Sequence, residues 1–399
     1  MGASVDSGCQ LTSVEICAGA GGQARGLHRA GFAHKALLEI DPYAVATLRM
    51  NVDKGNLSAE RILNEDLNDF VDSKVCQKLD IDPGDLDLLA GGVPCPPFSL
   101  AGRQLGEDDD RDLFPVMLNL VDELRPKAVM IENVRGLLEP VGKFSSYRKW
   151  ILDRLRDMGY DVVPEGPDLA RSWRILEARD FHVPQLRPRA ILVAIRRDVA
   201  HLGGEFAWPI RSKSGVMSVY DALYDTMRDR CLAAGDAGKR VFARWKKKAK
   251  AAAEKGGNYA VAPTLVGGSK KHGGADLGPT RAKRAWAELG IDAMGVANDP
   301  EDCVPSRDLL RDAGPMLTVK QAAIIQGFPP EWEFAGGKTA RYRQVGNAFP
   351  PPVAEAVGRA IAAVLRPELR RGGFLEGLEM EDANDLNGVQ EVLFEPIPA

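Results

Sequence analysis

Cysteine is scarce in this chain, and its copies are scattered along the sequence. No two of them form a Cys-x-x-Cys pair, so the spacing of a zinc site or of a disulfide framework is missing. Unpaired cysteines fit a reducing cytosol, and we expect no metal. The six positions are Cys9, Cys17, Cys76, Cys95, Cys231 and Cys303.

Long apolar runs are also missing. No stretch approaches the ~20 residues of a membrane-spanning helix, and Met1–Asp6 lacks the pattern of a signal peptide. Hydrophobic residues make up 45% and charged residues 27% of the 399 residues, which is typical of a globular protein. We expect a cytoplasmic chain with no membrane partner, built as one large and one smaller domain.

The net charge of -4 hides an uneven distribution. Thirteen lysines and arginines lie between Lys239 and Arg284, against two acidic residues. From Leu375 onward there are seven acidic residues and no basic one, and we expect this tail to be disordered. The basic block is either a solvated surface or a footprint for a phosphate backbone, and composition alone favours neither.

Short apolar runs alternate with amphipathic stretches through the first half of the chain. This alternation predicts an α/β fold, with a mostly parallel, doubly wound sheet covered on both faces. The predicted strands are Ser13–Cys17, Ala36–Ile40, Leu86–Ala90, Ala128–Ile131 and Ala190–Arg196. The predicted helices in this part are Tyr43–Asn51, Leu113–Leu124 and Tyr147–Met158.

The periodicity is poor from about residue 197 to 314, where glycine pairs interrupt basic stretches. We expect a smaller, loop-rich domain there. Helical patterns return at Val319–Gln326 and Pro352–Leu365, which predicts that C-terminal helices complete the first domain. The predicted boundaries are 1–196 with 315–366 for the first domain, 197–314 for the second, and 367–399 for the acidic tail.

The loop Gly92–Ser99 carries Cys95 between prolines, directly after the predicted strand Leu86–Ala90. Prolines stiffen the chain, and open α/β sheets bind ligands at the carboxyl ends of their strands. Cys95 is therefore a candidate nucleophile. A lone cysteine is more often buried and inert, so this hypothesis depends on the sites that follow.

A glycine-rich turn, Glu-Ile-Cys-Ala-Gly-Ala-Gly-Gly at residues 15–22, follows the first strand. Its glycines allow close backbone approach, and the next helix offers free N–H groups. Glu39 ends the second strand, where a carboxylate can accept hydrogen bonds from ribose hydroxyls, and Asp66 could accept from an adenine amino group. Together they indicate an adenosine-containing cofactor. The alternative role of an acidic residue, capping a helix, fits Asp41 better than Glu39.

Glu132 ends another predicted strand and so shares the sheet edge with Cys95. A carboxyl group beside a nucleophilic thiol suits attack on an electron-poor ring, because the acid can protonate the ring as sulfur adds. A structural pair between Glu132 and Arg135 is the alternative.

Two further segments carry polar side chains at suggestive spacings. Gln185, Arg187 and Arg189 alternate on an extended chain, and two guanidinium groups on one face suit a phosphate or a carbonyl oxygen. An ordinary surface strand explains them equally well. The turn Arg-Gln-Val-Gly-Asn-Ala at 343–348 either braces a cofactor or simply enters a helix.

In this order and spacing, these sites resemble the DNA (cytosine-5)-methyltransferases. The resemblance covers roughly residues 11–196 and 317–365. Its motifs are Cys-Ala-Gly-Ala-Gly-Gly, Pro-Cys-Pro-Pro-Phe-Ser, Glu-Asn-Val, Gln-Leu-Arg-Pro-Arg, Leu-Thr…Gln-Gly-Phe-Pro and Gln-Val-Gly-Asn-Ala. It implies a Rossmann-like methyltransferase domain that binds S-adenosylmethionine, interrupted by a target-recognition domain at 197–314.

The resemblance also implies roles for residues. A cytosine is flipped out of the duplex, Cys95 adds to C6, Glu132 acts at N3 and Arg189 at O2, while Arg187 braces the loop or a phosphate. Cofactor-binding positions are Cys17, Ala18, Gly19, Gly21, Gly22, Glu39, Ile40, Asp66, Leu67, Pro94, Leu113, Asn347 and Ala348. DNA-contacting positions are Ser99, Arg103, Gln104, Arg111, Lys270, Lys271, Arg281 and Arg284.

Several positions depart from the family pattern. Cys17 and Ile40 stand where aromatic residues usually flank the adenine, which predicts a less aromatic pocket. Gln321 and Ile324 replace a glutamate and an arginine, which exchanges a buried ion pair for neutral groups. Neither change removes a group that the expected chemistry needs.

Three rival functions remain. A tRNA cytosine-5 methyltransferase shares the motifs, but the long basic insert favours duplex DNA. A catalytically silent DNA-binding protein would not need Cys95, Glu132 and Arg189. A nicotinamide-dependent dehydrogenase would explain only the glycine turn and Glu39. We expect a monomeric bacterial modification enzyme, associated with the nucleoid through DNA, with a restriction endonuclease as its genetic partner.

Overall fold

The computed structural model describes residues 10–72, 74–94, 112–139, 144–163, 166–267 and 277–381. Two compact units divide the chain between them. Unit 1 is drawn from Met1–Leu176, Pro188–Pro209 and Val353–Leu378, and unit 2 from Glu177–Arg187, Ile210–Pro352 and Glu379–Ala399. Within the described ranges, no helix has the length and apolar character needed to cross a membrane.

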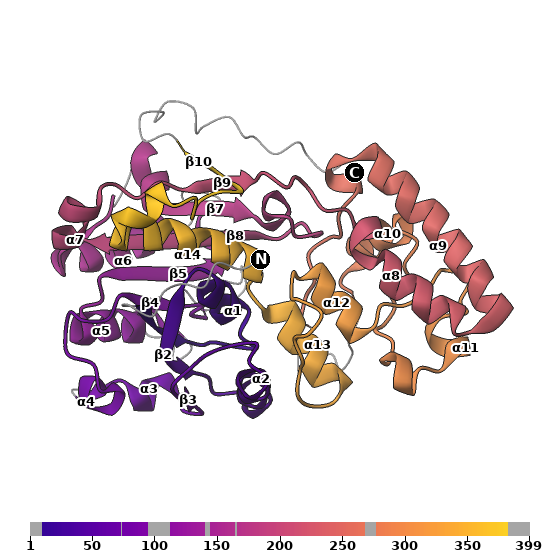
Figure 1. Cartoon of the computed structure of the whole chain (residues 1–399), viewed down its shortest axis with the longest axis horizontal. Coiled ribbons are helices and arrows are strands. Elements are labelled where there is room, and N and C mark those ends of the chain that lie inside the picture. The colour runs from indigo at the N-terminus through magenta and orange to yellow at the C-terminus, as the bar shows by residue number, and fades with distance from the viewer. Residues whose placement is uncertain are drawn as a thin grey trace. The chain divides into compact units, whose positions relative to one another are not determined.

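The centre of unit 1 is a sheet of eight strands (Figure 1). They are β1 Leu11–Ile16, β2 Phe32–Leu38, β3 Ile62–Leu63, β4 Leu88–Gly91, β5 Ala128–Val134, β6 Tyr160–Asp161, β7 Trp173–Glu177 and β8 Pro188–Arg196. The order is β3-β2-β1-β4-β5-β8-β6, and β7 pairs with β8. The first five strands of this order run parallel, and β8 runs antiparallel to β5 and β6. The predicted fold class is thus confirmed.

Helices cover both faces of this sheet, as a parallel sheet requires. They are α1 Gly22–Arg29, α2 Pro42–Asp53, α3 Leu67–Phe70, α4 Val75–Leu79, α5 Phe114–Leu124, α6 Ser145–Asp157, α7 Arg197–Gly203 and α14 Pro351–Leu365. Val14 and Ile16 point to one face, where they join the core formed with α5 and α6. Ser13 points to the other face, toward α1, and α14 packs on α1 through Gly358.

Unit 2 is largely helical. Its helices are α8 Val219–Leu232, α9 Gly235–Lys255, α10 Thr280–Glu288, α11 Pro305–Asp308, α12 Val319–Ile325 and α13 Lys338–Asn347. The prediction of a loop-rich region at 197–314 is therefore wrong. The lysine and alanine run of α9 hides its period, because only the small or buried positions Gly238, Val241, Trp245, Ala249 and Ala252 mark its inner face.

Short 3-10 helices occur in both units, at η2 Arg135–Leu137, η3 Pro167–Arg171, η4 Ala178–Phe181, η5 Gly257–Tyr259, η6 Pro300–Asp302 and η7 Pro367–Arg371.

Aromatic rings hold α8 against α9. Tyr220 stacks on Trp245 at 6.1 Å between ring centroids, and Phe242 meets both Trp245 and Tyr224 within 6 Å. Close to the turn that joins the helices, a Cβ on Gly238 would lie 1.9 Å from the carbonyl oxygen of Cys231. A glycine at this position therefore lets the two helices approach.

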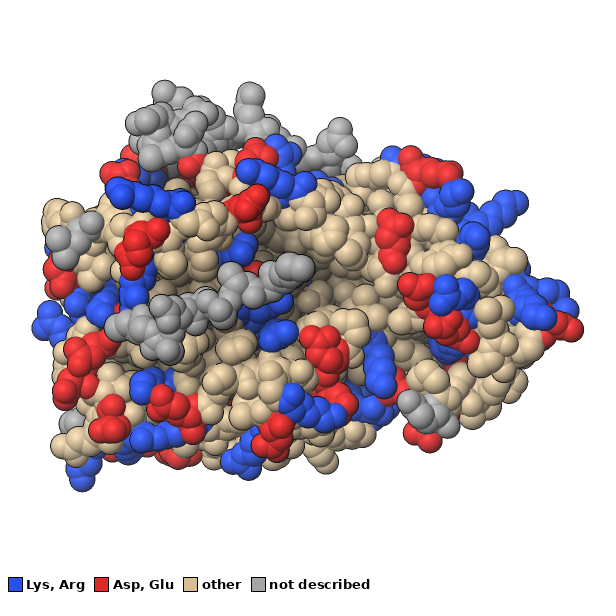
Figure 2. All heavy atoms as spheres, viewed as in Figure 1, with Lys and Arg blue, Asp and Glu red and all other residues tan. Residues whose placement is uncertain are grey.

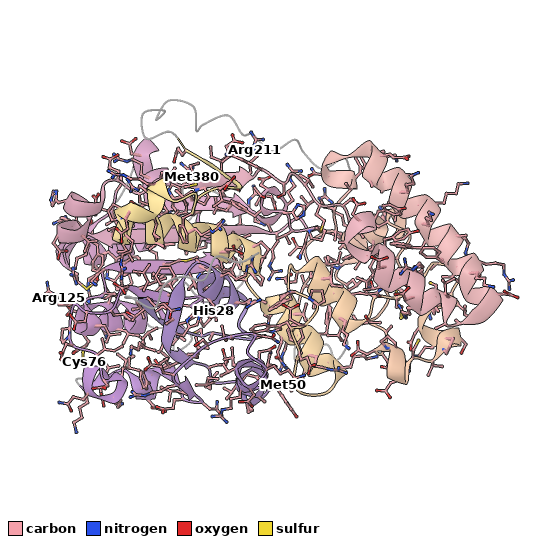
Figure 3. All side chains as sticks on the ribbon, in the orientation of Figure 1. His28, Met50, Cys76, Arg125, Arg211 and Met380 are labelled. Atoms are coloured by element: carbon pink, nitrogen blue, oxygen red, sulfur yellow. The ribbon has the colours of Figure 1, made fainter. Side chains whose placement is uncertain are left out.

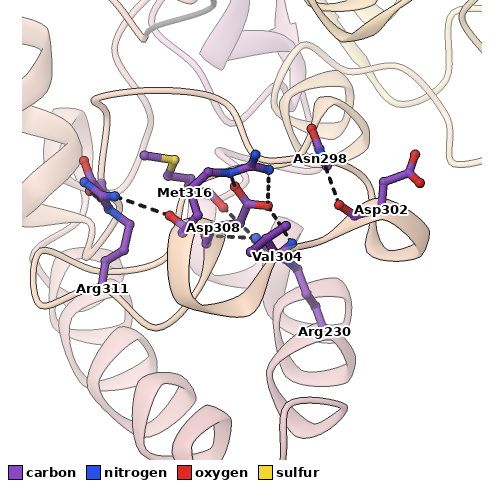
Figure 4. A network of polar contacts seen from close by, with 9 residues as sticks. Arg230, Asn298, Asp302, Val304, Asp308, Arg311 and Met316 are labelled. Carbon is purple, nitrogen blue, oxygen red and sulfur yellow. Dashed lines mark hydrogen bonds and ion pairs between the residues drawn. The ribbon is translucent and has the colours of Figure 1, made fainter.

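Arg230, a buried arginine of α8, belongs to a network of polar contacts within unit 2 (Figure 4). Arg230 donates to the carbonyl oxygens of Met316 at 2.6 Å and of Asp308 at 3.0 Å, and contacts Oε1 of Gln321 at 3.4 Å. Gln321 also forms a reciprocal capping box with Thr318 at the start of α12. The exchange to neutral groups is thus accompanied by a guanidinium that binds backbone oxygens.

The observed boundaries differ from the predicted ones. Residues 315–352, expected in the first domain, belong to unit 2, and so does Glu177–Arg187. Part of the expected disordered tail is ordered, because Leu378–Met380 forms β10 and pairs with β9, Pro209–Ser212. Arg211 of β9 and Met380 of β10 lie near each other (Figure 3), and Arg211 forms an ion pair with Glu379 at 2.7 Å. Residues 382–399 lie outside the described residues.

The approach of α8 and α9 leads to a stability prediction. Gly238→Ala should lower the free energy of unfolding by about 1–3 kcal/mol, because the new methyl group would overlap backbone atoms that cannot move easily. Gly136→Ala is the matched control, since nothing lies within 4 Å of a Cβ there. Urea denaturation of both variants measures the difference, and equal stabilities would contradict the close approach.

Candidate active site

The glycine turn lies between β1 and α1, at the carboxyl edge of the sheet. Three of its residues have positive φ: Cys17 at 51°, Gly19 at 54° and Gly21 at 81°. Gly21 caps α1 without a side-chain hydrogen bond, and one N–H group of the first turn, that of Ala24, donates instead to the buried Glu15 carboxyl. The turn itself is anchored by Ala18, whose N–H donates to the carbonyl oxygen of Leu38 at 3.0 Å.

Glu39 is fixed beside this turn. Its Oε2 accepts from the N–H of Gly19 at 2.7 Å, and its Oε1 accepts from the N–H of Asp41 at 2.8 Å. Asp41 caps α2, which confirms the prediction for that residue. Two backbone donors therefore hold one carboxylate in place, and its remaining lone pairs stay available for ligand hydroxyls.

Ile40 and Asp66 lie at the ends of the next elements. Ile40 is 60% exposed although it is a large apolar residue. Asp66 caps α3, accepting from the N–H of Asn68 at 2.9 Å, and Leu67 begins that helix with a buried side chain. Capping is thus a second use of the Asp66 carboxylate, beside the adenine contact that we expected.

Cys17 is chemically quiet in this environment. Burial raises the pKa of its thiol to about 12, and the negative charges of Glu39, Glu15 and Asp66 act in the same direction. The thiol is therefore protonated and serves as a small packing group. The three carboxyl groups that contribute to this raised pKa therefore lie close to the glycine turn.

Glu132 and Arg189 form the second part of the candidate site. The antiparallel register of β5 and β8 brings them together, and Arg189 Nε lies 2.7 Å from Glu132 Oε1. Their side chains are only 16% and 13% exposed, so water screens the pair little. Arg189, and not Arg135, is the partner of Glu132, since Arg135 pairs with Glu139.

The chain that leads to Cys95 passes directly along this pair. A Cβ on Gly92 would lie 2.9 Å from Oε2 of Glu132, and Asn133 Nδ2 donates to the carbonyl oxygen of Val93 at 2.9 Å. The ends of β4 and β5 are therefore joined just before Pro94, where this part of the described chain stops. Cys95, Ser99, Arg103, Gln104 and Arg111 lie outside the described residues, and Leu113 caps α5 after the gap.

Gln185 and Arg187 are interior residues of unit 2. Arg187 is buried and donates to the carbonyl oxygens of Leu265 and Gly346, each at 2.8 Å. Gln185 is also buried, and its Oε1 accepts from the N–H of Leu265 at 2.8 Å. Of the two roles expected for Arg187, these contacts agree with bracing a loop and not with binding a phosphate, because they bind the segment into the interior of unit 2.

Asn347 and Ala348 belong to the same part of unit 2. A Cβ on Gly267 would lie 2.1 Å from Asn347 Oδ1, so the end of α13 presses against the segment that precedes Lys270 and Lys271. Those two lysines lie outside the described residues. Arg281 and Arg284, in contrast, are exposed on α10.

A buried polar layer under α1 was missed from the sequence. His34 Nε2 lies 2.9 Å from the carbonyl oxygen of Ala24, and Ser13 Oγ lies 2.9 Å from His34 Nδ1. A carbonyl oxygen only accepts, so Nε2 carries the proton and Nδ1 accepts from the hydroxyl. Glu15, also fully buried here, has its pKa raised well above the usual range by burial. The sequence signal that could have revealed this layer is Glu15, a charged residue within an otherwise mostly apolar predicted strand.

A family model described as C-5 cytosine-specific DNA methylase matches residues 11–363. The chain belongs to this family. It is 48% identical over 359 residues to the Type II methyltransferase M.NaeI of Lentzea aerocolonigenes, covering 90% of this chain and 76% of that protein. It is 42% identical to the Type II methyltransferase M.NgoMIV of Neisseria gonorrhoeae over 363 residues, 90% of this chain and 99% of that protein.

Solved structures of the same fold are more distant in sequence. A putative DNA modification methyltransferase encoded within an E. coli prophage superposes with a TM-score of 0.54 at 20% identity, covering 89% of this chain and 99% of that chain. A Spodoptera frugiperda DNMT2 mutant gives 0.54 at 16% identity, over 88% and 99%. These similarities establish the fold and nothing finer.

The role of Arg187 leads to a stability prediction. Arg187→Met should lower the free energy of unfolding by about 2–4 kcal/mol, because two buried carbonyl oxygens lose their donors. Arg187→Lys should recover part of this loss. Chemical denaturation measures both, and a variant as stable as the parent would contradict a bracing role.

The layer under α1 leads to a pH prediction. Burial lowers the pKa of His34 to about 4, whereas an unfolded histidine titrates near 6.5. As the pH falls from about 6.5 to 4, the unfolded chain takes up a proton that the folded chain refuses. The free energy of unfolding should then fall by up to about 1.4 kcal/mol per pH unit. Urea denaturation at several pH values measures this slope. The slope should be weaker in His34→Gln and unchanged in the control His201→Gln, which alters an exposed histidine. Equal slopes in His34→Gln and the parent would contradict the assignment to His34.

Proposed function

We propose that this chain transfers a methyl group from S-adenosylmethionine to C5 of a cytosine within a specific sequence of duplex DNA. The observation that carries the proposal is the Glu132–Arg189 pair beside the chain that enters the Cys95 loop. Membership of the methylase family supports it. The resemblance to enzymes named Type II methyltransferases further supports a modification enzyme with a restriction endonuclease as its genetic partner.

The residues at the glycine turn suit S-adenosylmethionine. The fixed carboxylate of Glu39 suits the ribose hydroxyls, and the exposed Ile40 offers an apolar surface to the adenine. Cys17 and Ile40 in place of aromatic side chains make this pocket less aromatic. When bound, the cofactor supplies an electrophilic methyl group. By the resemblance to the family, Asn347 and Ala348 are also assigned to cofactor binding.

The protein groups perform the chemistry on the base. The Cys95 thiolate adds to C6 of the flipped cytosine, forming an S–C6 bond and moving electron density toward C5. Glu132 holds the proton or hydrogen bond at N3, and Arg189 fixes that carboxylate while facing the O2 oxygen. After C5 is methylated, loss of the C5 proton restores the C5–C6 double bond and expels the cysteine sulfur. Methyl transfer would leave S-adenosylhomocysteine, the C5 proton would pass to water, and the Cys95 thiolate would be regenerated.

The DNA contacts follow from chemistry and chain position. Ser99, Arg103, Gln104 and Arg111 flank the nucleophile on the chain, so we place them around the target base. Lys270, Lys271, Arg281 and Arg284 are assigned to phosphates and base edges of the duplex. The enzyme acts as a monomer in the bacterial cytoplasm, at the nucleoid, in this proposal.

Methylation sequencing tests the proposal. DNA incubated with the protein and S-adenosylmethionine should carry 5-methylcytosine within one short motif, and Cys95→Ala should abolish it. Glu132→Gln should slow methylation by about 10²–10⁴-fold, the usual contribution of a general acid. Cys76→Ala is the matched control and should retain full activity.

Two outcomes would overturn the assignment. Methyl transfer to tRNA with none to DNA would favour the tRNA enzyme. Unchanged activity in Cys95→Ala would remove that residue as the nucleophile, whatever the substrate.

A further inference from the structure

Most of the basic block lies on one helix that the proposed chemistry leaves unused. α9 carries eight lysines and arginines against two acidic residues. Its buried side is Gly238, Val241, Trp245, Ala249 and Ala252, and these residues share one face of the helix. The cations occupy the remainder of the circumference. Figure 2 shows blue side chains over the part of unit 2 where α9 lies, at the right of the view.

The cations are not all used within the protein. Lys239 pairs with Asp236 at 2.8 Å, and Lys250 lies 3.7 Å from Glu254. Arg240 and Lys247 are exposed, and no ion pair or hydrogen bond joins either of them to the described residues. They are seven positions apart in the sequence, which is about two turns, so both point the same way from α9.

Small residues lie between these cations. Ala243 and Ala251 are exposed at three or four residues from Arg240, Arg244 or Lys247 on the helix. The guanidinium and ammonium groups are therefore the most protruding groups of this surface. Arg244 is held in place by a hydrogen bond, since its Nη2 donates to the carbonyl oxygen of Arg311 at 3.2 Å. A row of cations with little between them suits a line of phosphates.

The neighbouring helix shows that this charge is specific to α9. α8 exposes Asp225 and Asp229 with Arg228 bonded to both, so its surface is not basic. A lipid surface fits α9 poorly, because its apolar face, with Val241 and Trp245, is buried against α8 and cannot insert.

The position of α9 within unit 2 separates it from the segment before Lys270. That segment packs on α13 through Gly267. The shortest chain of contacts to α9 leads through α10, because a Cβ on Gly278 would lie 3.6 Å from Val266 Cγ2 and Lys248 Nζ of α9 donates to the carbonyl oxygen of Ala287 at 3.2 Å. Packed helix axes lie 8–10 Å apart, so these two steps put up to roughly 20 Å between the two regions. On B-DNA this distance corresponds to about six base pairs.

We propose that the exposed face of α9 is a second, sequence-independent contact that binds the phosphate backbone of duplex DNA flanking the target site. This inference rests on the proposed function, since it assumes that unit 2 engages DNA. Arg240 and Lys247 are the central contacts. The surface raises affinity for long DNA without contributing to the choice of target.

The test compares two duplex lengths. The double variant Arg240→Gln/Lys247→Gln and the parent are titrated with a 14-bp and a 60-bp duplex of arbitrary sequence, across a range of KCl. We expect about ten-fold weaker binding to the 60-bp duplex at 0.1 M salt, a salt slope smaller by about two, and little change on the 14-bp duplex. Lys213→Gln/Arg371→Gln, which removes the same charge from other exposed positions, should bind both duplexes as the parent does.

Methylation of a short target duplex by the same variants reports the proposed function separately. Equal activity of parent and double variant on it, with the length-dependent loss above, supports the inference. Parental binding to both lengths, an equal loss on both, or an equal loss in the control would overturn the inference while leaving the methylation result intact. Binding to anionic vesicles that the double variant abolishes, with DNA binding unchanged, would assign the surface to lipid instead.

Discussion

Parallel strand pairing is the constraint on which the candidate site depends. Because β2, β1, β4 and β5 run in one direction, their carboxyl ends meet at one edge. Each part of the candidate site lies at the end of one of these strands. The glycine turn, Glu39 and the chain entering Pro94 follow their strands directly, and Glu132 lies within the last residues of β5. The pairing of the strands is therefore sufficient to bring these groups together. The antiparallel strand β8 then adds the one group that parallel neighbours do not supply, the guanidinium of Arg189.

Much of this edge could be predicted from the sequence because it is local. A glycine turn, a carboxylate ending a strand and an aspartate before a helix each have a short-range signature, and Glu39, Asp41 and Glu132 lie where their patterns indicated. The strand ranges agree to within a few residues for the same reason. The partner of Glu132 needed the register of β5 and β8, which sequence spacing does not contain.

The remaining features depend on burial, which spacing alone does not reveal. Alternation correctly grouped Gln185 with Arg187, yet both are interior side chains: Arg187 donates to a backbone oxygen and Gln185 accepts from a backbone N–H. Arg230 behaves in the same way, because its buried guanidinium donates to the carbonyl oxygens of Met316 and Asp308. α9 was missed because alanine and lysine form a helix without the large apolar residues that mark a period. In unit 2, arginine is a structural residue as much as a surface charge.

The contact between Gly267 and the end of α13 joins two segments of unit 2 that lie far apart in the sequence. A Cβ on Gly267 would lie 2.1 Å from Asn347 Oδ1, and a Cβ on Gly346 would lie 2.6 Å from the Gly267 Cα. Neither glycine can therefore gain a side chain unless the other segment moves away. The two positions act as a mutual constraint, and a substitution at one of them cannot be compensated by a larger residue at the other.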